Sequence, residues 1–304
     1  MIPDRLILGA HVRDALNKGQ AVVALESTII THGMPYPQNL KMARGVEDLI
    51  RKNGAVPATV AIMDGQMVAG VDDDALERLS REGHTAAKAS RRDLAAVLAG
   101  GGLAGTTVAT TMMISAMAGI RVFATGGIGG VHRGAETSFD ISADLRELGQ
   151  TPVAVVCAGA KAILDIPKTL EVLETNGVPV IGWKTDEFPV FYTRKSGHKL
   201  DHHFDDESKL AEMLKLHFDL DLGGVLIANP VPEEFEIDRN TAESWIKAAL
   251  HQAQQRGVTG KDITPFLLQA IFDLTGGKSL KTNIELARNN AAVAARIAVA
   301  LAHH

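Results

Sequence analysis

The chain has 304 residues, of which 46% are hydrophobic and 22% charged, an ordinary composition for a globular protein with a sizeable core. Its formal net charge of −5 gives no sign of the basic surface with which proteins bind nucleic acids or anionic membranes. The single cysteine, Cys157, excludes an internal disulfide framework and is typical of a reducing environment.

The sequence predicts neither a signal peptide nor a membrane span. Residues 1–16 carry charges at Asp4, Arg5 and Arg13 where a signal peptide has an apolar core. The uncharged stretch 103–120 is rich in Gly, Thr and Ser, whereas a membrane span needs ~20 predominantly apolar residues. We therefore expect a cytoplasmic protein that binds neither membranes nor nucleic acids.

Strand and helix patterns alternate along the first half of the chain. Apolar β-branched runs predict strands, and amphipathic spacing predicts helices. The pair Asp64-Gly65 predicts the turn of a β-hairpin. The expected elements are a strand at 21–28, a helix at 39–55, a hairpin at 58–70, helices at 72–83 and 106–120, a strand at 121–127 and a helix at 141–150.

The second half continues this alternation. The apolar run 151–160 predicts a strand buried on both faces, and we expect a helix from Lys161 to Gly177 directly after it. Further strands are expected at 178–183 and 223–230, and further helices at 209–220, 241–257 and 282–302, with 190–208 as the least regular part. This order predicts one domain, residues 1–304, with a three-layer α/β/α fold and a mostly parallel or mixed sheet.

Polar side chains follow several of the predicted strands. Ligands of such sheets bind beyond the carboxyl ends of the strands. Each side chain also has an ordinary structural explanation: Glu26 could cap a turn, and Lys161 could be an exposed lysine. Their shared position favours one common site, formed by Glu26, His132, Arg133, Asp140, Lys161 and Asn229.

The glycine-rich loop at 126–130 does not complete a nucleotide-binding motif. The dinucleotide pattern G-x-G-x-x-G, started at Gly127, reaches His132 in its last place, and no G-x-x-x-x-G-K-[ST] occurs. A phosphate group has better candidates elsewhere. The segment 105–111 supplies hydroxyls and amides at a helix start, and basic side chains gather at His84, Lys88, Arg91 and Arg92, although these could also be a solvated surface.

Metal-binding candidates are few. Asp140 and Asp144 are four residues apart, which would place both carboxylates on one helical face if the helix included Asp140. Carboxylate ligands with water suit Mg²⁺ or Mn²⁺. The His- and Asp-rich run 198–206 lacks metal-ligand spacing and is interpreted as a solvated loop, and Cys157 as a core residue.

Lys161 offers the most distinctive chemistry. Partial burial disfavours the charged form of a lysine, and a neutral amine attacks carbonyl carbons to form a Schiff base. Sugars present such a carbon when their ring opens. A carboxyl group such as Glu26 could transfer protons beside it. These residues alone indicate Schiff-base chemistry on a small phosphosugar.

Long contiguous segments resemble the pseudouridine-5′-phosphate glycosidase family. They extend from about Asp14 to Ala295, and the stretch 185–222 is the least similar part. The segments are "ALESTIITHGMP", "TTVATT", "FATGGIGGVHRGAETSFDISADL", "VVCAGAKAILD", "ANPVPEE", "TPFLL" and "LTGGKSLKTNIELARNNA", together with the basic region ending in "SRRDL".

The resemblance implies an enzyme that reversibly cleaves pseudouridine 5′-phosphate with water to uracil and ribose 5-phosphate. The resemblance also implies that Lys161 attacks C1′ of the opened ribose and forms an imine, and that Glu26 is the proton donor. It further implies a homotrimer with one Mn²⁺ per subunit, Mg²⁺ being an alternative, held by Asp140. The residues it places around the substrate are Lys88, Val108, His132, Ser142, Ala143, Asp144 and Asn283.

Two other functions remain open on the sequence alone. A Schiff-base phosphosugar aldolase would share Lys161 and the phosphate-binding residues but would need neither a metal nor a uracil pocket. A catalytically silent binding protein of the same fold would form no adduct at Lys161. Release of free uracil from pseudouridine 5′-phosphate would distinguish the glycosidase from both of these alternatives.

Overall fold

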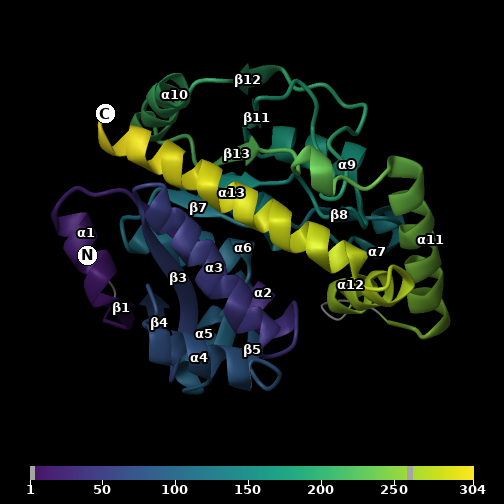
Figure 1. Ribbon diagram of the computed structural model, residues 1–304, viewed down its shortest axis with the longest axis horizontal. Coiled ribbons are helices and arrows are strands. Elements are labelled where there is room, and N and C mark those ends of the chain that lie inside the picture. Colours follow the sequence, from purple (N-terminus) through teal and green to yellow (C-terminus); the bar gives the residue numbers. More distant parts are fainter. Residues whose placement is uncertain (1–3, 259–262) are drawn as a thin grey trace.

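The computed structural model describes residues 4–258 and 263–304 and has an α/β/α architecture (Figure 1). Its main sheet has eleven strands, nine of them in the order β1-β4-β3-β2-β7-β9-β13-β11-β12, with β6 paired to β3 and β5 to β6. All neighbours are parallel except β3–β4 and β3–β6. The strands are β1 Leu6–Leu8, β2 Val22–Leu25, β3 Val56–Met63, β4 Gln66–Ala69, β5 Ala87–Ala89, β6 Ala104–Thr106, β7 Val122–Ala124, β9 Ala154–Cys157, β11 Val180–Trp183, β12 His202–Phe204 and β13 Val225–Ala228.

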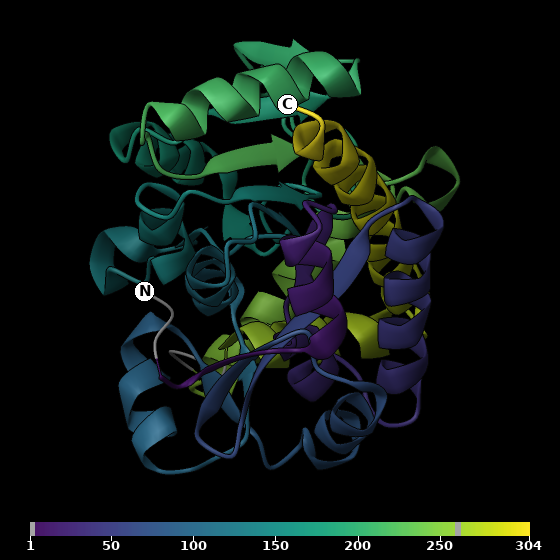
Figure 2. The ribbon, with the colours of Figure 1, turned by 90° about the vertical axis from the view of Figure 1, so that its left-hand side faces the viewer.

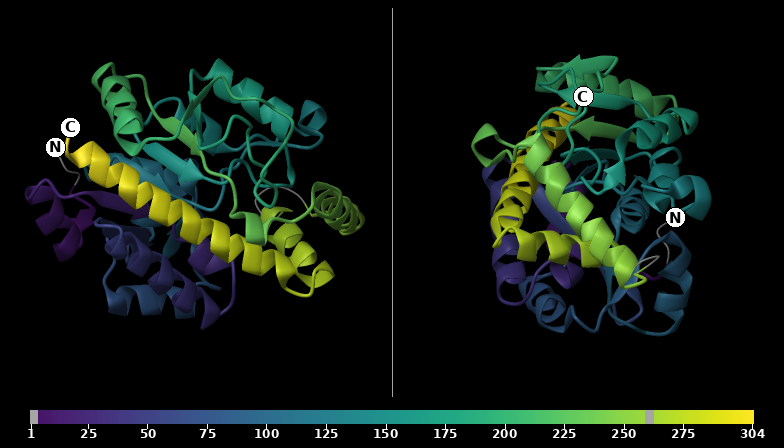
Figure 3. Two further views of the ribbon diagram at one scale, coloured as in Figure 1. Left: turned by 45° about the horizontal axis from the view of Figure 1, so that its top comes forward. Right: turned by 90° about the vertical axis from the view of Figure 1, so that its right-hand side faces the viewer.

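Two groups of helices cover the two faces of this sheet. On one face α13 packs against α3 and α10 and crosses strands β2, β7 and β9. Figure 2 shows α3 and α13 side by side, and in Figure 3 α13 crosses the whole molecule, with α11 and α12 near its N-terminal end. The helices are α1 Ala10–Asn17, α2 Thr28–His32, α3 Gln38–Lys52, α4 Asp73–Glu82, α5 Leu94–Ala99, α6 Val108–Met117, α7 Ala135–Ser138, α8 Ala143–Leu148, α9 Ile166–Thr175, α10 Glu207–Asp219, α11 Arg239–Gln255, α12 Ile263–Leu274 and α13 Lys278–Ala302.

The central strands are buried on both faces, as their uninterrupted apolar runs predict. In β9, Val155 and Cys157 belong to the core beneath α1, α6, α8 and α9, whereas Ala154 and Val156 belong to the core beneath α3, α10 and α13. This alternation follows from the two-residue period of a strand. The predicted fold class is therefore confirmed.

The predicted hairpin is also confirmed. Strands β3 and β4 pair antiparallel, with Met63 opposite Gln66. Asp64 and Gly65 have φ values of 50° and 73°, the left-handed conformation that a two-residue hairpin turn requires at both positions. None of the helices in the described ranges is both long enough and apolar enough to cross a membrane.

The prediction of a helix beginning at Lys161 is wrong. Lys161 lies in a loop, Leu164–Asp165 forms the short strand β10, and α9 begins at Ile166. Pro167 lies in the first turn of α9, and the Asp165 side chain accepts a hydrogen bond from the backbone N–H of Lys168. Because proline is tolerated only in the first turn of a helix, the segment Asp165-Ile166-Pro167 sets the helix start.

Strand β10 pairs antiparallel with β8, Val131–His132. This small second sheet holds the chain that follows Lys161 against the chain that follows the glycine loop. The irregular stretch 190–208 contains one strand that the sequence analysis missed, β12, which extends the main sheet parallel to β11.

Asn290 connects α13 to the sheet. Its side chain is fully buried; Nδ2 donates to the carbonyl of Thr125 at 2.8 Å, and Oδ1 accepts from Nδ2 of Asn229 at 2.8 Å. Thr125 directly follows β7 and Asn229 directly follows β13. The amide therefore fixes two strand ends near the cavity described below.

We expect Asn290→Ala to lower the free energy of unfolding by about 3 kcal/mol, because it leaves buried polar groups on both strand ends without partners. Urea denaturation measures this loss. Asn289→Ala is the control, since the half-buried Asn289 amide makes one bond, to the Pro230 carbonyl at 3.2 Å, and should cost about 1 kcal/mol or less. Equal losses in the two variants would contradict the role given to Asn290.

Candidate active site

The principal cavity lies beyond the carboxyl ends of the central strands and has a volume of about 670 Å³. Its walls come from the segments after β2, β6, β8 and β9, the β5–η1 segment and the start of α8, where η1 is a 3-10 turn at Arg91–Asp93. The lining includes the predicted site residues Glu26, Lys88, Val108, His132, Asp140, Ser142, Ala143, Asp144 and Lys161, whereas the predicted Arg133, Asn229 and Asn283 do not belong to it.

A smaller cavity of about 60 Å³ adjoins the principal one. The two share Glu26, Thr28, Lys88 and Lys161 in their walls. Asn283 of α13 lines the smaller cavity, as do Phe191, Leu268 and His32. Lys161 and Glu26 thus lie where a large, charged space meets a small, more apolar one.

Glu26 is held in an environment that disfavours its charge. It follows β2, and the hydroxyl of Thr125 donates a hydrogen bond to its Oε1. Burial raises the pKa of the Glu26 carboxyl, although the nearby Lys161 ammonium acts in the opposite direction. The carboxyl is therefore better able to hold a proton than an ordinary glutamate.

Lys161 is positioned by its backbone. Its N–H donates to the carbonyl of Ile128 at 3.1 Å, and Ala160 forms a parallel bridge with Ile128. The half-buried side chain lines both cavities. The glycine loop thereby fixes the point from which the lysine enters the site.

Asp144 has both carboxylate oxygens bound to backbone N–H groups. Oδ1 accepts from Ala109 at 3.0 Å and Oδ2 from Gly129 at 2.8 Å. A carboxylate is favoured in the first turn of a helix such as α6, and here it also ties that turn to the glycine loop. The structure therefore gives Asp144 an organising position in the wall, and its predicted contact with substrate stays a prediction.

His132, in β8, lies beside Asp140, which follows α7. Nδ1 of His132 lies 4.0 Å from Oδ2 of Asp140. Burial lowers the pKa of His132, an effect that the Asp140 carboxylate partly offsets and that the charges of Lys161 and Lys88 reinforce. The next residue, Arg133, lies outside the principal cavity.

Basic side chains form one wall of the principal cavity. Lys88, Arg91 and Arg92, all in the predicted basic group, line it together with Arg146 of α8. His84 lies outside the lining, on an exposed turn where its Nδ1 is 3.2 Å from the Arg81 carbonyl. Arg146 was missed although it follows the predicted segment Ser142–Asp144 by two residues, and His32 was missed although it lies in the quoted segment "ALESTIITHGMP".

Asp140 and Asp144 do not share a helical face. Helix α8 begins at Ala143, with Ser142 as its cap, so Asp140 precedes the helix and the condition for a paired carboxylate site is not met. Within residues 4–258 and 263–304, no three or more His, Cys, Asp or Glu side chains gather as a metal-binding group. The donor set fits only a cation that takes one carboxylate, from Asp140, and completes its coordination with water or substrate oxygens, as Mg²⁺-like ions do.

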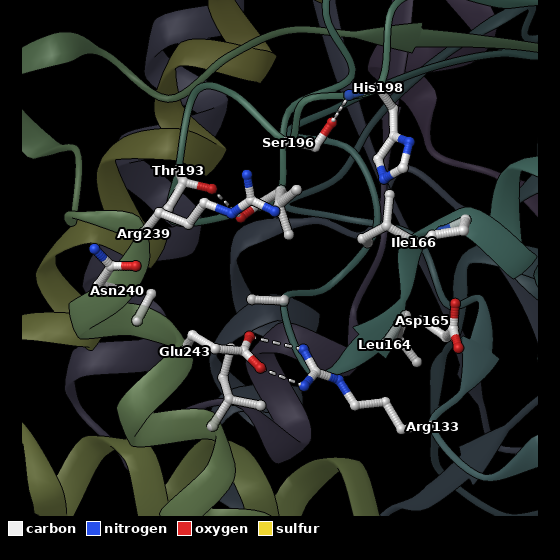
Figure 4. Close-up of a pocket in the computed structure, with 15 residues that line it drawn as sticks. Arg133, Leu164, Asp165, Ile166, Thr193, Ser196, His198, Arg239, Asn240 and Glu243 are labelled. Atoms are coloured by element: carbon white, nitrogen blue, oxygen red, sulfur yellow. Dashed lines mark hydrogen bonds and ion pairs between the residues drawn. The ribbon is translucent and has the colours of Figure 1, made fainter.

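A third cavity, of about 510 Å³, lies on the other side of the β8–β10 pair. Figure 4 shows the Arg133 guanidinium joined to the Glu243 carboxylate by two hydrogen bonds, of 2.7 and 3.0 Å. Leu164 lines both this cavity and the principal one. Arg133 was expected in the common site because it follows a strand, but it faces this separate space.

Fold and site together define an α/β enzyme whose cavity suits a small anionic molecule. The family model described as "Indigoidine synthase A like protein" matches residues 11–300. The chain belongs to this family, and its curated relatives confirm the predicted membership of the pseudouridine-5′-phosphate glycosidases.

Three of these relatives carry the name pseudouridine-5′-phosphate glycosidase. The protein of Sorangium cellulosum is 64% identical over 99% of this chain and 95% of its own. The protein of Caldanaerobacter subterraneus subsp. tengcongensis is 59% identical over 97% and 96%, and that of Clostridium botulinum is 53% identical over 99% and 98%.

Two solved structures share the fold over nearly the whole chain. The prealnumycin C-glycosynthase AlnA, solved in complex with ribulose 5-phosphate, has a TM-score of 0.91 and 38% identity, covering 99% of this chain and 98% of its own. An indigoidine synthase A-like protein from Thermotoga maritima has a TM-score of 0.88 and 34% identity, covering 98% and 96%.

The raised pKa of Glu26 predicts a pH-dependent effect on stability. The pKa of Glu26 in the folded state lies above its unfolded value, which is near 4.5. Between these two pKa values the folded state holds a proton that the unfolded state has lost. The free energy of unfolding of the parent therefore falls as the pH rises through this range. Glu26→Gln carries no such charge. Its melting temperature should therefore rise relative to that of the parent as the pH increases above about 4.5.

Glu136→Gln provides the control for that measurement. Lys168 Nζ, 2.8 Å from the Glu136 carboxylate, lowers the pKa of this exposed group, so its replacement should give no gain as pH rises. A difference between Glu26→Gln and the parent that is flat with pH would show that burial does not disfavour the Glu26 charge.

Proposed function

We propose that this chain cleaves the carbon–carbon glycosidic bond of pseudouridine 5′-phosphate with water, reversibly releasing uracil and ribose 5-phosphate. The observation that carries the proposal is the position of Lys161 and Glu26 on the boundary between the two adjoining cavities. The names of relatives 53–64% identical over nearly the full chain support the substrate.

The two cavities suit the two halves of this substrate. The basic wall formed by Lys88, Arg91, Arg92 and Arg146 suits a phosphate dianion. The smaller cavity, with Phe191, Leu268 and the Asn283 amide, suits a flat base with polar edges. The ribulose 5-phosphate complex of AlnA supports a pentose phosphate as the ligand of this fold.

Lys161 is proposed as the nucleophile. As the ribose ring opens, Nζ forms a bond to C1′ while the C1′–O4′ bond breaks and O4′ takes a proton. The C1′–C5 bond then breaks, C5 of uracil receives a proton, and C1′ is left as an imine with Nζ. Water hydrolyses this imine, which frees ribose 5-phosphate and restores the amine.

Glu26 is proposed as the acid that delivers the proton to C5. Uracil leaves as a carbon group, so the bond to C1′ breaks only as that proton arrives. The raised pKa of Glu26 supports this role, because a general acid must still carry its proton near the working pH.

A divalent cation, Mn²⁺ with Mg²⁺ as the alternative, is proposed at Asp140. When bound, it would supply positive charge to orient the anionic substrate. The half-exposed Asp140 carboxylate offers one protein ligand for it. The proposed homotrimer rests on the family resemblance, and the proposed cytoplasmic location rests on the single cysteine, which is typical of a reducing environment.

The direct test is incubation of the purified chain with pseudouridine 5′-phosphate and Mn²⁺, followed by measurement of free uracil. Uracil and ribose 5-phosphate should appear in equal amounts. Cleavage of sugar carbons without release of a base would instead identify the aldolase, and absence of both turnover and any ribose adduct would identify a binding protein.

Lys161→Ala should abolish uracil release and the borohydride-trapped adduct with ribose 5-phosphate, because Nζ of Lys161 is the amine that forms the imine in this mechanism. Mass spectrometry of the trapped protein locates the adduct. Lys168→Ala is a suitable control, since Lys168 lies on the surface of α9 in ion pairs with Glu136 and Asp165. Undiminished turnover in Lys161→Ala would exclude the imine route.

Asp140→Asn should raise the Mn²⁺ concentration needed for half-maximal activity by about tenfold or more, because a neutral amide is a poorer ligand than a carboxylate for this ion. Activity titrated with Mn²⁺ after treatment with a chelator measures the change. The control is Asp186→Asn, a position in the region least similar to the family. An unchanged titration in Asp140→Asn would remove Asp140 from the metal site.

A further inference from the structure

Glu147, in the last turn of α8, has no exposed surface. Its Oε2 accepts hydrogen bonds from Arg91 Nη1 at 2.6 Å and from Gln150 Nε2 at 3.2 Å, and its Oε1 accepts one from the Thr151 hydroxyl. A buried carboxylate is tolerated only when it is paired and hydrogen-bonded. The buried charge therefore holds the Arg91 guanidinium in one place.

Arg91 is also fixed by its backbone. It begins η1, where the Ser90 and Asp93 side chains form a capping box with each other's backbone N–H groups. The Arg91 side chain is 46% exposed and lines the principal cavity. Because a guanidinium has five N–H donors and Glu147 engages it through Nη1, donors on Nε and Nη2 remain for a ligand in that cavity.

The wall around Arg91 is rich in positive charge. Lys88 and Arg146 line the same cavity, and so does Arg92, whose side chain is 81% exposed. A mobile arginine loses conformational entropy when a ligand immobilises it, and this loss lowers the affinity. An arginine that is already held in place avoids the loss of entropy on binding. Arg91, held by Glu147, is thus better prepared than Arg92 to bind an anion.

We propose that Glu147 is a positioning residue that holds Arg91 as a binding residue for the substrate's phosphate group. This inference rests on the proposed function for the molecule that carries the phosphate. Glu147 touches no substrate. It acts through Arg91, and the pair sets affinity for phosphorylated ligands rather than the rate of bond cleavage.

The chain contains a closely matched pair outside the cavities. Glu47, whose side chain is 8% exposed, accepts from Arg51 Nη2 at 2.7 Å and from the Thr59 hydroxyl at 2.7 Å. The Arg51 side chain is 51% exposed. Both pairs therefore combine a buried glutamate, a threonine hydroxyl and a half-exposed arginine, but Arg51 lies on α3 outside the principal cavity's lining.

The first experiment compares Glu147→Gln, Arg91→Gln and the double variant, each as the full chain. With pseudouridine 5′-phosphate, each single variant should raise KM about tenfold while kcat stays within about threefold, the pattern of a lost binding contact. The KM of the double variant should be no higher than that of Arg91→Gln alone, because the two residues act as one unit.

The second experiment does not depend on turnover. Inorganic phosphate should raise the melting temperature of the parent, since a ligand of the folded state stabilises it, and this rise should be largely lost in Glu147→Gln and Arg91→Gln. If the chain fails to cleave pseudouridine 5′-phosphate, the response to phosphate still tests the role of Glu147 and Arg91. A failure of the proposed function is therefore distinguishable from a failure of this inference.

Glu47→Gln is the matched control. It should lower the melting temperature to a similar extent as Glu147→Gln but keep the parent KM and the parent response to phosphate. Arg91→Lys provides a second test of the proposal if Glu147→Gln does not fold. A lysine still neutralises Glu147, yet its point charge cannot engage the carboxylate and a second anion as a planar fork does, so KM should still rise.

A parent KM and a parent phosphate response in either Glu147→Gln or Arg91→Lys would overturn the proposal. So would the same KM rise in Glu47→Gln, since that would show a general effect of destabilisation.

Discussion

The site depends on the burial of the Glu26 carboxyl beside the Lys161 amine. Burial favours the neutral acid, whereas the neighbouring ammonium favours the carboxylate. The protonation of Glu26 therefore depends on its surroundings, for example on whether a ligand displaces water. The strands bring this about because β2 and β9 lie on either side of β7 and run parallel to it, so that their carboxyl ends open on the same side of the sheet.

Around this pair, the backbone is organised by buried carboxylates that take no part in bond making. Asp144 joins the first turn of α6 to the glycine loop, and Glu147, one turn later in α8, joins that helix to Arg91. One short helix thus fixes two walls of the principal cavity. This explains why a carboxylate, that of Asp144, lies in the wall of a cavity whose proposed substrate is itself an anion.

Much of this arrangement could be predicted from the sequence. The buried runs at 21–28 and 151–160, the Asp64-Gly65 turn and the residues after the strands led to the α/β/α fold and to Glu26, Lys161, His132 and Asp140. The family segments added Val108 and Asn283, whose apolar or amide side chains carry no chemical signal of their own. Contacts between distant segments could not be predicted, because hydrogen bonds such as Arg91–Glu147 depend on how helices dock.

The errors have physical causes. Pro167 overrode the helical pattern after Lys161, as its ring permits only a first-turn position. Arg133 was expected beside His132 in one site, but it is the first residue after β8, and its side chain pairs with Glu243 in the third cavity. His84 was grouped with Lys88 by proximity in the sequence, yet the turn after α4 leaves it on the surface.

The thin partition formed by β8 and β10 also limits how the protein can be redesigned. Among the residues that the structure describes, Leu164 is the one that lines the cavities on both sides of it. A smaller residue at this position, introduced to admit a bulkier sugar, would weaken the barrier between the two cavities close to Lys161, the proposed nucleophile. Room for larger substrates is therefore better sought in the basic wall than in the partition.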